Sequence, residues 1–489
     1  MRDFGIGSWP ARRARKTPHR TAVLDPGGRF TYAELHERVN RLANALRGLG
    51  VGRGDRVAYL GPNHHTFLEA LFASGALGAV FVPLNTRLAA PELRHCLDDS
   101  GAVVLIHDPA LPVPAGPRTI AVGPDYEDLL AGASAEAVEE AVALDDPFII
   151  MYTSGTTGLP KGALLTHGNL TWNAFNVLVD VDLASDETTL CTAPLFHTAG
   201  LNMTCLPTLL KGGRVVLEPS FDPGRTLKLV ESLRVTYMFG VPVMFDAIAR
   251  SAAWAGADLS SLRRVSCGGA PVPPATIRAY LERGVVFSQG YGMTEASPGV
   301  LFLAAEDSAR KAGTAGVPHF FTDVAIVGPD SRPVNTGQRG EVMVNGPNVM
   351  REYWGRPGDT AAAFADGWLR TGDIATADAD GFVSIVDRAK DMFISGGENV
   401  SPAEVETALG RHPAVADCAV IGVPDATWGE VGRAIVVLAD DTVDGTELLA
   451  FLRGRLAGYK IPKSVVFAAA LPRSPTGKII RRILREEYR

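Results

Sequence analysis

Cysteine is scarce in this sequence, and its arrangement argues against two kinds of site. The five cysteines are an odd number spread over 489 residues, and they form no CxxC pair. A disulfide framework or a structural zinc site needs paired or closely spaced cysteines. We therefore expect reduced thiols packed in the core, as in a cytoplasmic protein.

An excess of positive charge is also missing. The formal net charge is −7, whereas a nucleic-acid-binding domain presents a basic face. Nucleic acid is therefore not an expected partner. The first residues mix Arg, Lys and Pro without an apolar stretch, so we expect no signal peptide and a cytoplasmic location.

Long hydrophobic runs are nearly absent, and only Phe67–Leu84 comes close to one. Glu69 and Pro83 interrupt it, so a buried helix over 66–77 followed by a strand over 79–82 fits better than a membrane-spanning segment. Peripheral attachment to a membrane surface stays open.

The length and the order of the predicted elements indicate an α/β protein of at least two domains, because a single core stops growing at about 250–300 residues. Apolar strand-like runs alternate with helical patterns through the first two thirds, as in Arg214–Leu217 followed by Thr226–Ser232. This alternation is typical of βα units and parallel sheets. From about Phe320, short runs separated by turn residues predict an antiparallel or barrel-like subdomain.

After Asp391 the pattern starts again, which predicts a small α+β domain. Pro402–Leu409 is expected to be a helix with Glu404 and Glu406 on its polar side, and Thr446–Leu456 to be a second helix.

The strongest motif is DDPFIIMYTSGTTGLPKG at Asp145–Gly162. A predicted strand runs into glycines, whose backbone N–H groups can converge on an anion, and into hydroxyls that add donors. It is not a Walker A loop, because Pro160 and Gly162 flank the lysine. We predict a phosphate-binding loop made of Thr153, Ser154, Gly155, Thr156, Thr157, Gly158 and Lys161.

Further motifs follow in order: APLFHTAG at 193–200, GGAP at 268–271, QGYGMTE at 289–295, WLRTGD at 368–373, DRAKDMFISGGENVSPAEVE at 387–406 and PRSPTGKI at 472–479. Together they resemble the adenylate-forming superfamily of acyl-CoA synthetases, luciferases and peptide-synthetase adenylation domains. The wording is most similar to bacterial fatty-acyl- and aryl-CoA ligases of the actinobacterial type. The resemblance implies a large N-terminal domain (1–388) and a small mobile C-terminal α+β domain (389–489).

The residue types in QGYGMTE are suited to nucleotide binding even without the family resemblance. The ring of Tyr291 can stack on a purine, Thr294 can reach the α-phosphate, and the Glu295 carboxylate is a hard ligand for Mg²⁺. Asp373 is expected after a turn at Thr371-Gly372. The resemblance implies that Asp373 and Arg388 bind the ribose, and that further nucleotide contacts come from Gly269, Ala270, Gln289, Gly290, Gly292 and Met293.

Four other positions draw a role mainly from the resemblance. Lys478 would bridge the acid's carboxylate and the α-phosphate, although an isolated lysine near a chain end is usually only solvated. His197 would be a gate beside the acid pocket, with a satisfied buried imidazole as the alternative. Lys390 would be the interdomain hinge, and Gly396-Gly397 would approach the pantetheine arm unless it is an ordinary turn.

The predicted function is an ATP- and Mg²⁺-dependent carboxylic acid:CoA ligase, with coenzyme A as the acceptor and a fatty or aryl acid as the substrate. The acid pocket is expected to draw on 196–203, 268–269 and 290–292. Transfer to a free-standing carrier protein or an amine, activation of another oxyanion, and a homodimeric state stay open. A non-catalytic nucleotide sensor is disfavoured, because Lys161, Glu295, Asp373, Arg388 and Lys478 are all intact.

Overall fold

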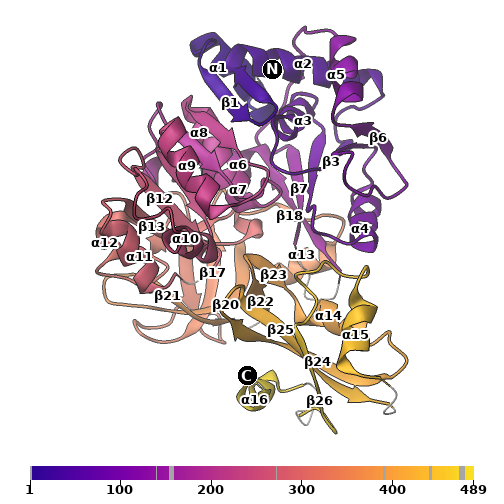
Figure 1. Ribbon diagram of the computed structural model, residues 1–489, viewed down its shortest axis with the longest axis vertical. Helices are drawn as coiled ribbons and strands as arrows, with labels where there is room; N and C mark the ends of the chain where they lie inside the picture. The colour runs from indigo at the N-terminus through magenta and orange to yellow at the C-terminus, as the bar shows by residue number, and fades with distance from the viewer. Residues whose placement is uncertain are drawn as a thin grey trace.

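The computed structural model describes residues 3–138, 140–153, 159–270, 272–388, 392–439, 443–472 and 479–488. In Figure 1 the chain runs from indigo elements at the top to the yellow C-terminal segment at the bottom, which lies against the rest of the molecule. Two large, mostly parallel sheets make up the first three hundred residues, and two smaller sheets follow.

The first large sheet has the order β15-β14-β13-β12-β11-β9-β10-β1-β2. The strands from β13 to β1 are parallel, and antiparallel strands close both edges. The strands are β1 (Thr21–Asp25), β2 (Gly28–Thr31), β9 (Thr188–Cys191), β10 (Arg214–Leu217), β11 (Tyr237–Gly240), β12 (Arg264–Gly268), β13 (Val286–Gly292), β14 (Gly299–Leu303) and β15 (Val317–Pro318).

Helices cover both faces of this sheet. The helices α9 (Pro223–Leu233), α10 (Pro242–Ala249) and α11 (Pro274–Leu281) pack on one face through a core that includes Phe245, Tyr280 and Phe287. On the other face α6 (His167–Asp180) packs toward Phe239 and Phe302. A π-helical turn, η2 (Leu201–Cys205), lies beside α6 and follows the short helix α7 (Thr198–Gly200).

The second large sheet has the order β18-β8-β7-β4-β3-β5-β6. Its antiparallel pair β7–β8 flanks the predicted phosphate loop, so the predicted strand before that loop is confirmed. The strands are β3 (Arg56–Leu60), β4 (Val80–Leu84), β5 (Val104–His107), β6 (Arg118–Ala121), β7 (Pro147–Thr153), β8 (Lys161–Thr166) and β18 (Glu352–Tyr353).

The charge-poor run near residue 70 forms α3 and then β4, as expected. Helix α3 is buried on nearly every side, which explains its almost uniform apolar sequence. In the described part of the chain, no helix has both the length and the apolar character needed to cross a membrane. The other helices before residue 310 are η1 (Ile6–Ser8), α1 (Trp9–Lys16), α2 (Tyr32–Gly48), α3 (His65–Ala76), α4 (Ala90–Ser100), α5 (Pro124–Ala131), α8 (Leu206–Lys211), η3 (Thr294–Ala296) and α12 (Ala305–Ser308).

The subdomain after Phe320 is antiparallel, as predicted, with the order β16-β17-β20-β19 and β21 paired to β20. The expected turn before Asp373 is wrong. Thr371-Gly372 instead forms a bulge inside the long strand β20, and Gly372 has the positive φ of 72° that a bulge favours. The elements are β16 (Asp323–Val327), β17 (Gly340–Asn345), α13 (Pro357–Ala363), β19 (Phe364–Ala365), β20 (Trp368–Ala377) and β21 (Val383–Arg388).

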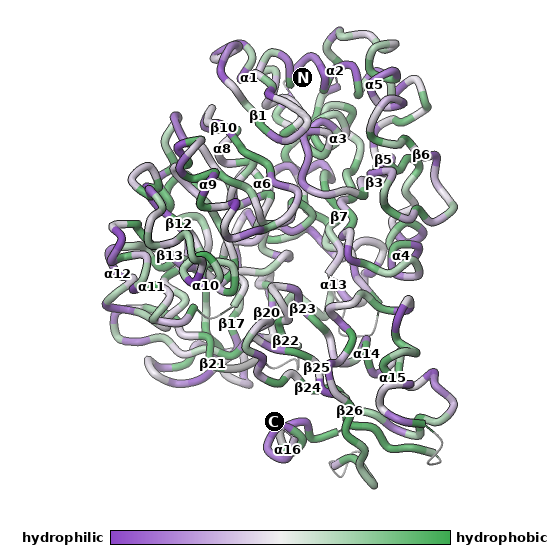
Figure 2. The backbone as a smooth tube through the Cα atoms, in the orientation of Figure 1, coloured by the Kyte–Doolittle hydropathy of each residue, from purple (hydrophilic) through white to green (hydrophobic). Residues whose placement is uncertain are grey.

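The C-terminal part is an α+β unit built on the sheet β23-β22-β25-β24, with β26 paired to β25. Figure 2 shows hydrophobic residues along β24 and hydrophilic ones on α16. The elements are β22 (Phe393–Ser395), β23 (Glu398–Val400), α14 (Pro402–Leu409), β24 (Val415–Asp425), β25 (Gly429–Leu438), α15 (Gly445–Leu452), β26 (Ser464–Phe467) and α16 (Arg481–Tyr488).

Two expectations for this part need correction. Helix α15 ends at Leu452 rather than Leu456, because Arg453 takes an extended backbone. Glu404 does not lie on a solvated face: it is 4% exposed and accepts a hydrogen bond from the buried Lys460 at 2.8 Å. Lys460, from a distant part of the chain, allows the Glu404 carboxylate to be buried because it supplies an opposite charge and a hydrogen bond.

All five cysteines are free and buried, which confirms the prediction of reduced core thiols.

Candidate active site

A cavity of about 710 Å³ opens at the carboxyl ends of β9, β11, β12 and β13. Ligands of open α/β sheets bind at this edge, where loops diverge from the strand ends. The walls come from four of the sequence motifs, because residues 193–194, 196–200, 268–269, 290–294 and 396–399 all line the cavity. Three segments expected in the acid pocket, around residues 200, 268 and 291, therefore meet in space.

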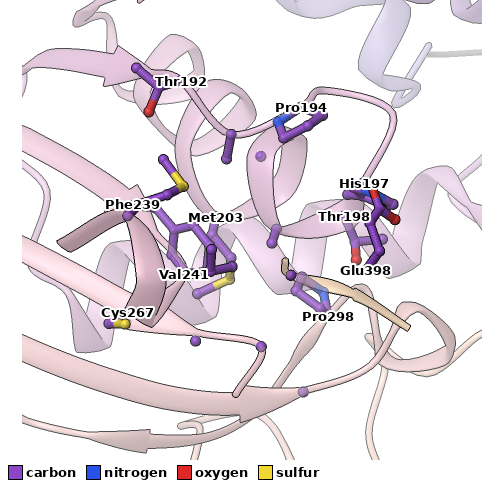
Figure 3. Close-up of a pocket in the computed structure, with 18 of the residues that line it drawn as sticks. Thr192, Pro194, His197, Thr198, Met203, Phe239, Val241, Cys267, Pro298 and Glu398 are labelled. Carbon is purple, nitrogen blue, oxygen red and sulfur yellow. Dashed lines mark ion pairs between the residues drawn. The ribbon is translucent and has the colours of Figure 1, made fainter. Parts of the chain in front are cut away.

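The two sides of this cavity differ in chemistry. Figure 3 shows His197 and Glu398 close together on one side, while Met203, Phe239 and Val241 gather on the other. Met203 comes from the π-helical turn η2, a distortion that often occurs at functional sites. The cavity thus has a polar side near the C-terminal part and an apolar side against the sheet.

A second cavity of about 440 Å³ lies on the other side of β13 and shares Gly269 and Gly290–Gly292 with the first. Ala270 and Gln289 also line it, and Gln289 is held by a hydrogen bond from its Nε2 to the Thr314 carbonyl at 2.7 Å. Six of the predicted nucleotide contacts therefore surround one space, namely Gly269, Ala270, Gln289, Gly290, Tyr291 and Gly292.

Tyr291 and Asp373 are brought together from different sheets. The Tyr291 hydroxyl donates to Asp373 Oδ2 at 2.6 Å, and the Asp373 side chain is 7% exposed. Asp373 pairs with Arg388 across the ladder between β20 and β21. The two positions predicted to bind the ribose, Asp373 and Arg388, are thus directly opposite each other on neighbouring strands. They lie beside the Tyr291 ring that is predicted to stack on the purine.

Lys161 and Glu295 also converge. Lys161 begins β8, and its Nζ donates to Asp359 at 2.7 Å and lies 5.8 Å from the centre of the Tyr353 ring. The Tyr353 hydroxyl donates to Glu295 Oε1 at 2.7 Å. Burial, together with the negative charge of Glu295, raises the pKa of Tyr353, so this hydroxyl stays a proton donor.

The residues around Glu295 fit a magnesium ion. Glu295 is 8% exposed in η3, next to the hydroxyl of Thr294. Tyr353 donates to Oε1, and no hydrogen bond to Oε2 is found among the described residues. A buried carboxylate with a free oxygen beside a phosphate site is the kind of ligand that Mg²⁺ uses together with water and phosphates.

His197 lies at the junction with the C-terminal part. Its Nε2 is 3.0 Å from Glu398 Oε2, and Arg87 Nη1 donates to Glu398 Oε1 at 2.8 Å. Burial alone would raise the pKa of Glu398, but the charge and close contact of His197, together with the charges of Arg87 and Lys460, outweigh it and lower the pKa. Glu398 is therefore held as a carboxylate against His197.

Gly396 and Gly397 form the two-residue turn between β22 and β23. Both have positive φ, 59° and 85°, as the tight turns that join such strands require. A Cβ on Gly396 would lie 2.6 Å from the Trp428 ring, and one on Gly397 would lie 3.3 Å from Val241. The glycines thus let the hairpin reach into the mouth of the first cavity.

Several predicted site residues fall elsewhere or lie outside the described residues. Thr153 ends β7, and its hydroxyl donates to the Lys161 carbonyl at 3.4 Å, while Met293 and Thr294 line the first cavity. Predicted positions outside the described residues are Ser154, Gly155, Thr156, Thr157, Gly158, Lys390 and Lys478, and the side chain of Arg388 is also not described.

Sequence reasoning missed several residues of this site, namely Arg87, Tyr353, Asp359 and Glu398. Glu398 was inside a quoted motif, and its neighbouring glycines were the signal that the segment approaches another part of the chain. Tyr353 is 58 residues from Glu295, and no local pattern links the two.

Known families and relatives match this chain over nearly its whole length. The family model "AMP-binding enzyme" matches residues 10–354, and "AMP-binding enzyme C-terminal domain" matches residues 404–478. The chain is 59% identical over 493 residues to a feruloyl-CoA synthase of Amycolatopsis sp, with all of both chains covered. It is 42% identical to indoleacetate–CoA ligase of Aromatoleum aromaticum, over 97% of this chain and 96% of that one.

Solved structures show the same architecture. A double mutant of o-succinylbenzoate CoA synthetase from Bacillus subtilis, bound with the product analogue OSB-NCoA, superposes with a TM-score of 0.91, at 34% identity and 98% coverage of both chains. The enzyme of the same name in complex with the acyl-adenylate intermediate OSB-AMP gives a TM-score of 0.74 with the same coverage.

Proposed function

Because the chain belongs to the AMP-binding enzyme family and is an ATP- and Mg²⁺-dependent carboxylic acid:CoA ligase that works through an acyl-adenylate, we propose that its acid is an aryl acid of the phenylpropenoic type. The aromatic and apolar side of the first cavity carries this proposal. Phe239 and Phe302 offer flat, rigid surfaces for a ring, and Met203 adds an adaptable apolar side chain.

The identity to a feruloyl-CoA synthase over the full length of both chains supports the same class of acid. Among the described residues that line the cavity, the only Lys or Arg side chain is Arg87, and Glu398 pairs with it. A second carboxylate on the substrate would therefore meet no free cation, which disfavours dicarboxylic acids.

In the first half-reaction, a carboxylate oxygen of the acid attacks the α-phosphorus of ATP, and the bond to pyrophosphate breaks. We assign Lys161 and the loop from Thr153 to the triphosphate, Asp373 and Arg388 to the ribose, and Tyr291 to the purine. Lys478 brings the two anions together. Mg²⁺ held by Glu295 would offset the charge on the phosphates.

In the second half-reaction, the thiol sulfur of coenzyme A attacks the acyl carbon, AMP leaves, and the thiol proton passes to solvent or a base. We propose that residues 389–489 move as a unit about Lys390 between the two steps. The arrangement of this structure is assigned to the thioester step. The higher TM-score with the complex of the CoA product analogue than with the acyl-adenylate complex supports this assignment.

The Glu398 contact with His197 supports a positioning role for His197. A histidine whose Nε2 faces a carboxylate is oriented by it. The pair lies where Gly396 and Gly397 narrow the cavity mouth, so in this arrangement it would border the path of the thiol.

The test is ATP–pyrophosphate exchange with cinnamate, hexadecanoate and succinate, followed by product analysis with and without CoA. We expect exchange with cinnamate and a cinnamoyl-CoA product. Exchange with hexadecanoate alone would refute the aryl assignment. Exchange without a thioester would point to the alternative acceptors, a carrier-protein phosphopantetheine or an amine, which the same assay can include.

We further propose a cytoplasmic location, supported by five buried free cysteines. A homodimer is the other partner state to test, by light scattering of the purified protein.

A further inference from the structure

A buried imidazole, paired with a partly buried carboxylate, forms part of the wall of the acid cavity. Asp180 is the last residue of α6, and its Oδ2 contacts Nδ1 of His319, which follows β15. The Phe320 backbone N–H donates to the same oxygen at 3.3 Å. An ionised carboxylate only accepts hydrogen bonds, so Nδ1 carries the proton. In the neutral imidazole, Nε2 then presents a lone pair and needs a donor.

The backbone fixes the imidazole with its other edge toward the cavity. The His319 N–H donates to the Val300 carbonyl at 3.1 Å, and the ring stacks on Phe302 with centroids 5.5 Å apart. The side chain is only 1% exposed, yet His319 lines the cavity. Among the described residues, no hydrogen bond to Nε2 is found.

Gly299 is what leaves this edge open. A Cβ built on Gly299 would lie 2.9 Å from Cδ2 and 3.0 Å from Nε2 of His319. Gly299 also lines the cavity and begins β14, directly after the segment that carries Thr294 and Glu295. The missing side chain therefore gives a ligand in the cavity access to an acceptor nitrogen.

Two buried hydroxyls in the cavity wall, those of Thr192 and Ser266, do not offer the same discrimination. Each hydroxyl oxygen is enclosed by protein, and a hydroxyl can rotate to donate or to accept. It would therefore tolerate a ligand hydroxyl and a ligand ether alike. In the neutral imidazole of His319, whose Nδ1–H points to Asp180, Nε2 can only accept.

We propose that His319 accepts a hydrogen bond from a ring hydroxyl of the aryl acid, positioned by Asp180, so that the enzyme selects 4-hydroxyphenyl acids. His319 stacks on Phe302, which belongs to the apolar cluster with Met203 and Phe239. That cluster lies away from His197 and Glu398 (Figure 3). A ring whose carboxylate lies near Thr294 therefore turns its far end toward His319. The inference depends on the proposed aryl-acid activity.

The experiment measures kcat/KM for 4-hydroxycinnamate, 4-methoxycinnamate and cinnamate in the same protein. The ratio between two acids cancels any general loss of folded enzyme. We expect the wild type to prefer the 4-hydroxy acid over both others by at least about tenfold, because the analogues leave Nε2 unpaired. In His319→Phe, which keeps a ring against Phe302, the ratio should fall to about one.

Two further variants test the parts separately. Asp180→Asn should lower the ratio partly, because Asn still accepts from Nδ1 but without a charge; Asp182→Asn, exposed two residues further on, is the matched control and should keep it. Gly299→Ala should lower the ratio with His319 intact, because the new methyl group would cover Nε2.

The outcomes separate the two proposals. If the wild type forms no thioester from any of the three acids, the aryl-acid function itself is wrong. If it uses all three equally, or if His319→Phe keeps the preference for the 4-hydroxy acid, the assignment of His319 is overturned while the aryl-acid function stands.

Discussion

Glu92→Gln should slow thioester formation selectively, because Glu92 ties the two proposed domains together in this arrangement. Lys460 Nζ donates to Glu92 Oε1 at 2.5 Å and to Glu404 Oε1 at 2.8 Å. Lys460 and Glu404 both belong to residues 389–489, whereas Glu92 lies in α4 of the N-terminal part. The Lys460–Glu404 pair therefore survives a domain rotation, and of these two contacts of Lys460 only the one with Glu92 is lost.

The size of the effect follows from burial. The side chains of Lys460 and Glu92 are 2% and 6% exposed. Burial alone would lower the pKa of Lys460, but the charges of Glu404 and Glu92 outweigh it and raise the pKa. A hydrogen bond to a charged group contributes about 1.5–3 kcal/mol, which corresponds to a factor of about 10–150 in the docking equilibrium.

Glutamine is a fitting replacement at position 92. Glu92 Oε2 accepts from the Ala89 N–H at 2.7 Å and so caps the start of α4. Glutamine can keep this cap through its carbonyl oxygen, but its amide then turns N–H groups toward the ammonium of Lys460. The substitution thus removes the interdomain charge without unfolding the helix.

The assay follows each half-reaction alone. Thioester formation is measured in single turnovers from supplied acyl-adenylate and CoA, and adenylation by ATP–pyrophosphate exchange. We expect the first rate to fall about tenfold to hundredfold and the second to change less than about threefold. Asp98→Asn, an exposed change in the same helix, is the control. Equal losses in both steps, or none in either, would refute the reasoning.

Three other predictions concern single side chains. Lys478→Ala should slow adenylation by about 10²–10³-fold and leave thioester formation from supplied acyl-adenylate within about threefold, as measured by the same two assays. Asp373→Asn should raise KM for ATP about tenfold, or about 1.4 kcal/mol. Tyr291→Phe should raise KM for ATP less, because Tyr291 acts through Asp373. Steady-state kinetics would contradict this prediction if the larger increase were found for Tyr291→Phe. The pKa of Glu398 is lowered in the folded protein, so its stabilising contact with His197 is present above the unfolded pKa of about 4.3 and is lost as pH falls through the lower folded pKa. The difference in unfolding free energy between wild type and Glu398→Gln should therefore shrink from pH 5 to pH 3 in urea titrations. A difference that stays constant over this range would contradict the prediction.

The sequence predicted the local elements well, because periodicity records which face of a segment is buried. Arg214–Leu217 forms a strand with the predicted bounds, and Pro402–Leu409 forms a helix with the predicted bounds. Residues 290–292, which were expected in the acid pocket, line the first cavity and also the second. These features depend on residues close together in the chain.

The sequence failed where burial depends on a distant partner. Glu404 looked solvated because carboxylates usually are, but Lys460 lies 56 residues away and Glu92 lies 368 residues from that lysine. Asp373 looked like the end of a turn because Thr371-Gly372 favours one. Pairing with β17 and β21 instead keeps the strand continuous and leaves only a bulge.

The strand β13 explains how one site can bring ATP and the acid together. It separates the two cavities, and at Gly290 and Gly292 only backbone stands between them. Neither glycine could carry a side chain, since a Cβ would lie 2.9 Å from the Leu301 carbonyl oxygen at Gly290 and 1.9 Å from that of Pro298 at Gly292. With the α-phosphate assigned to one side and the carboxylate to the other, we propose that they approach each other past the end of this strand, near Thr294, which lines the first cavity. We propose that the Thr294 hydroxyl contacts both groups there, so that backbone packing sets the position of the reaction and the side chains on the apolar side of the first cavity set the choice of acid.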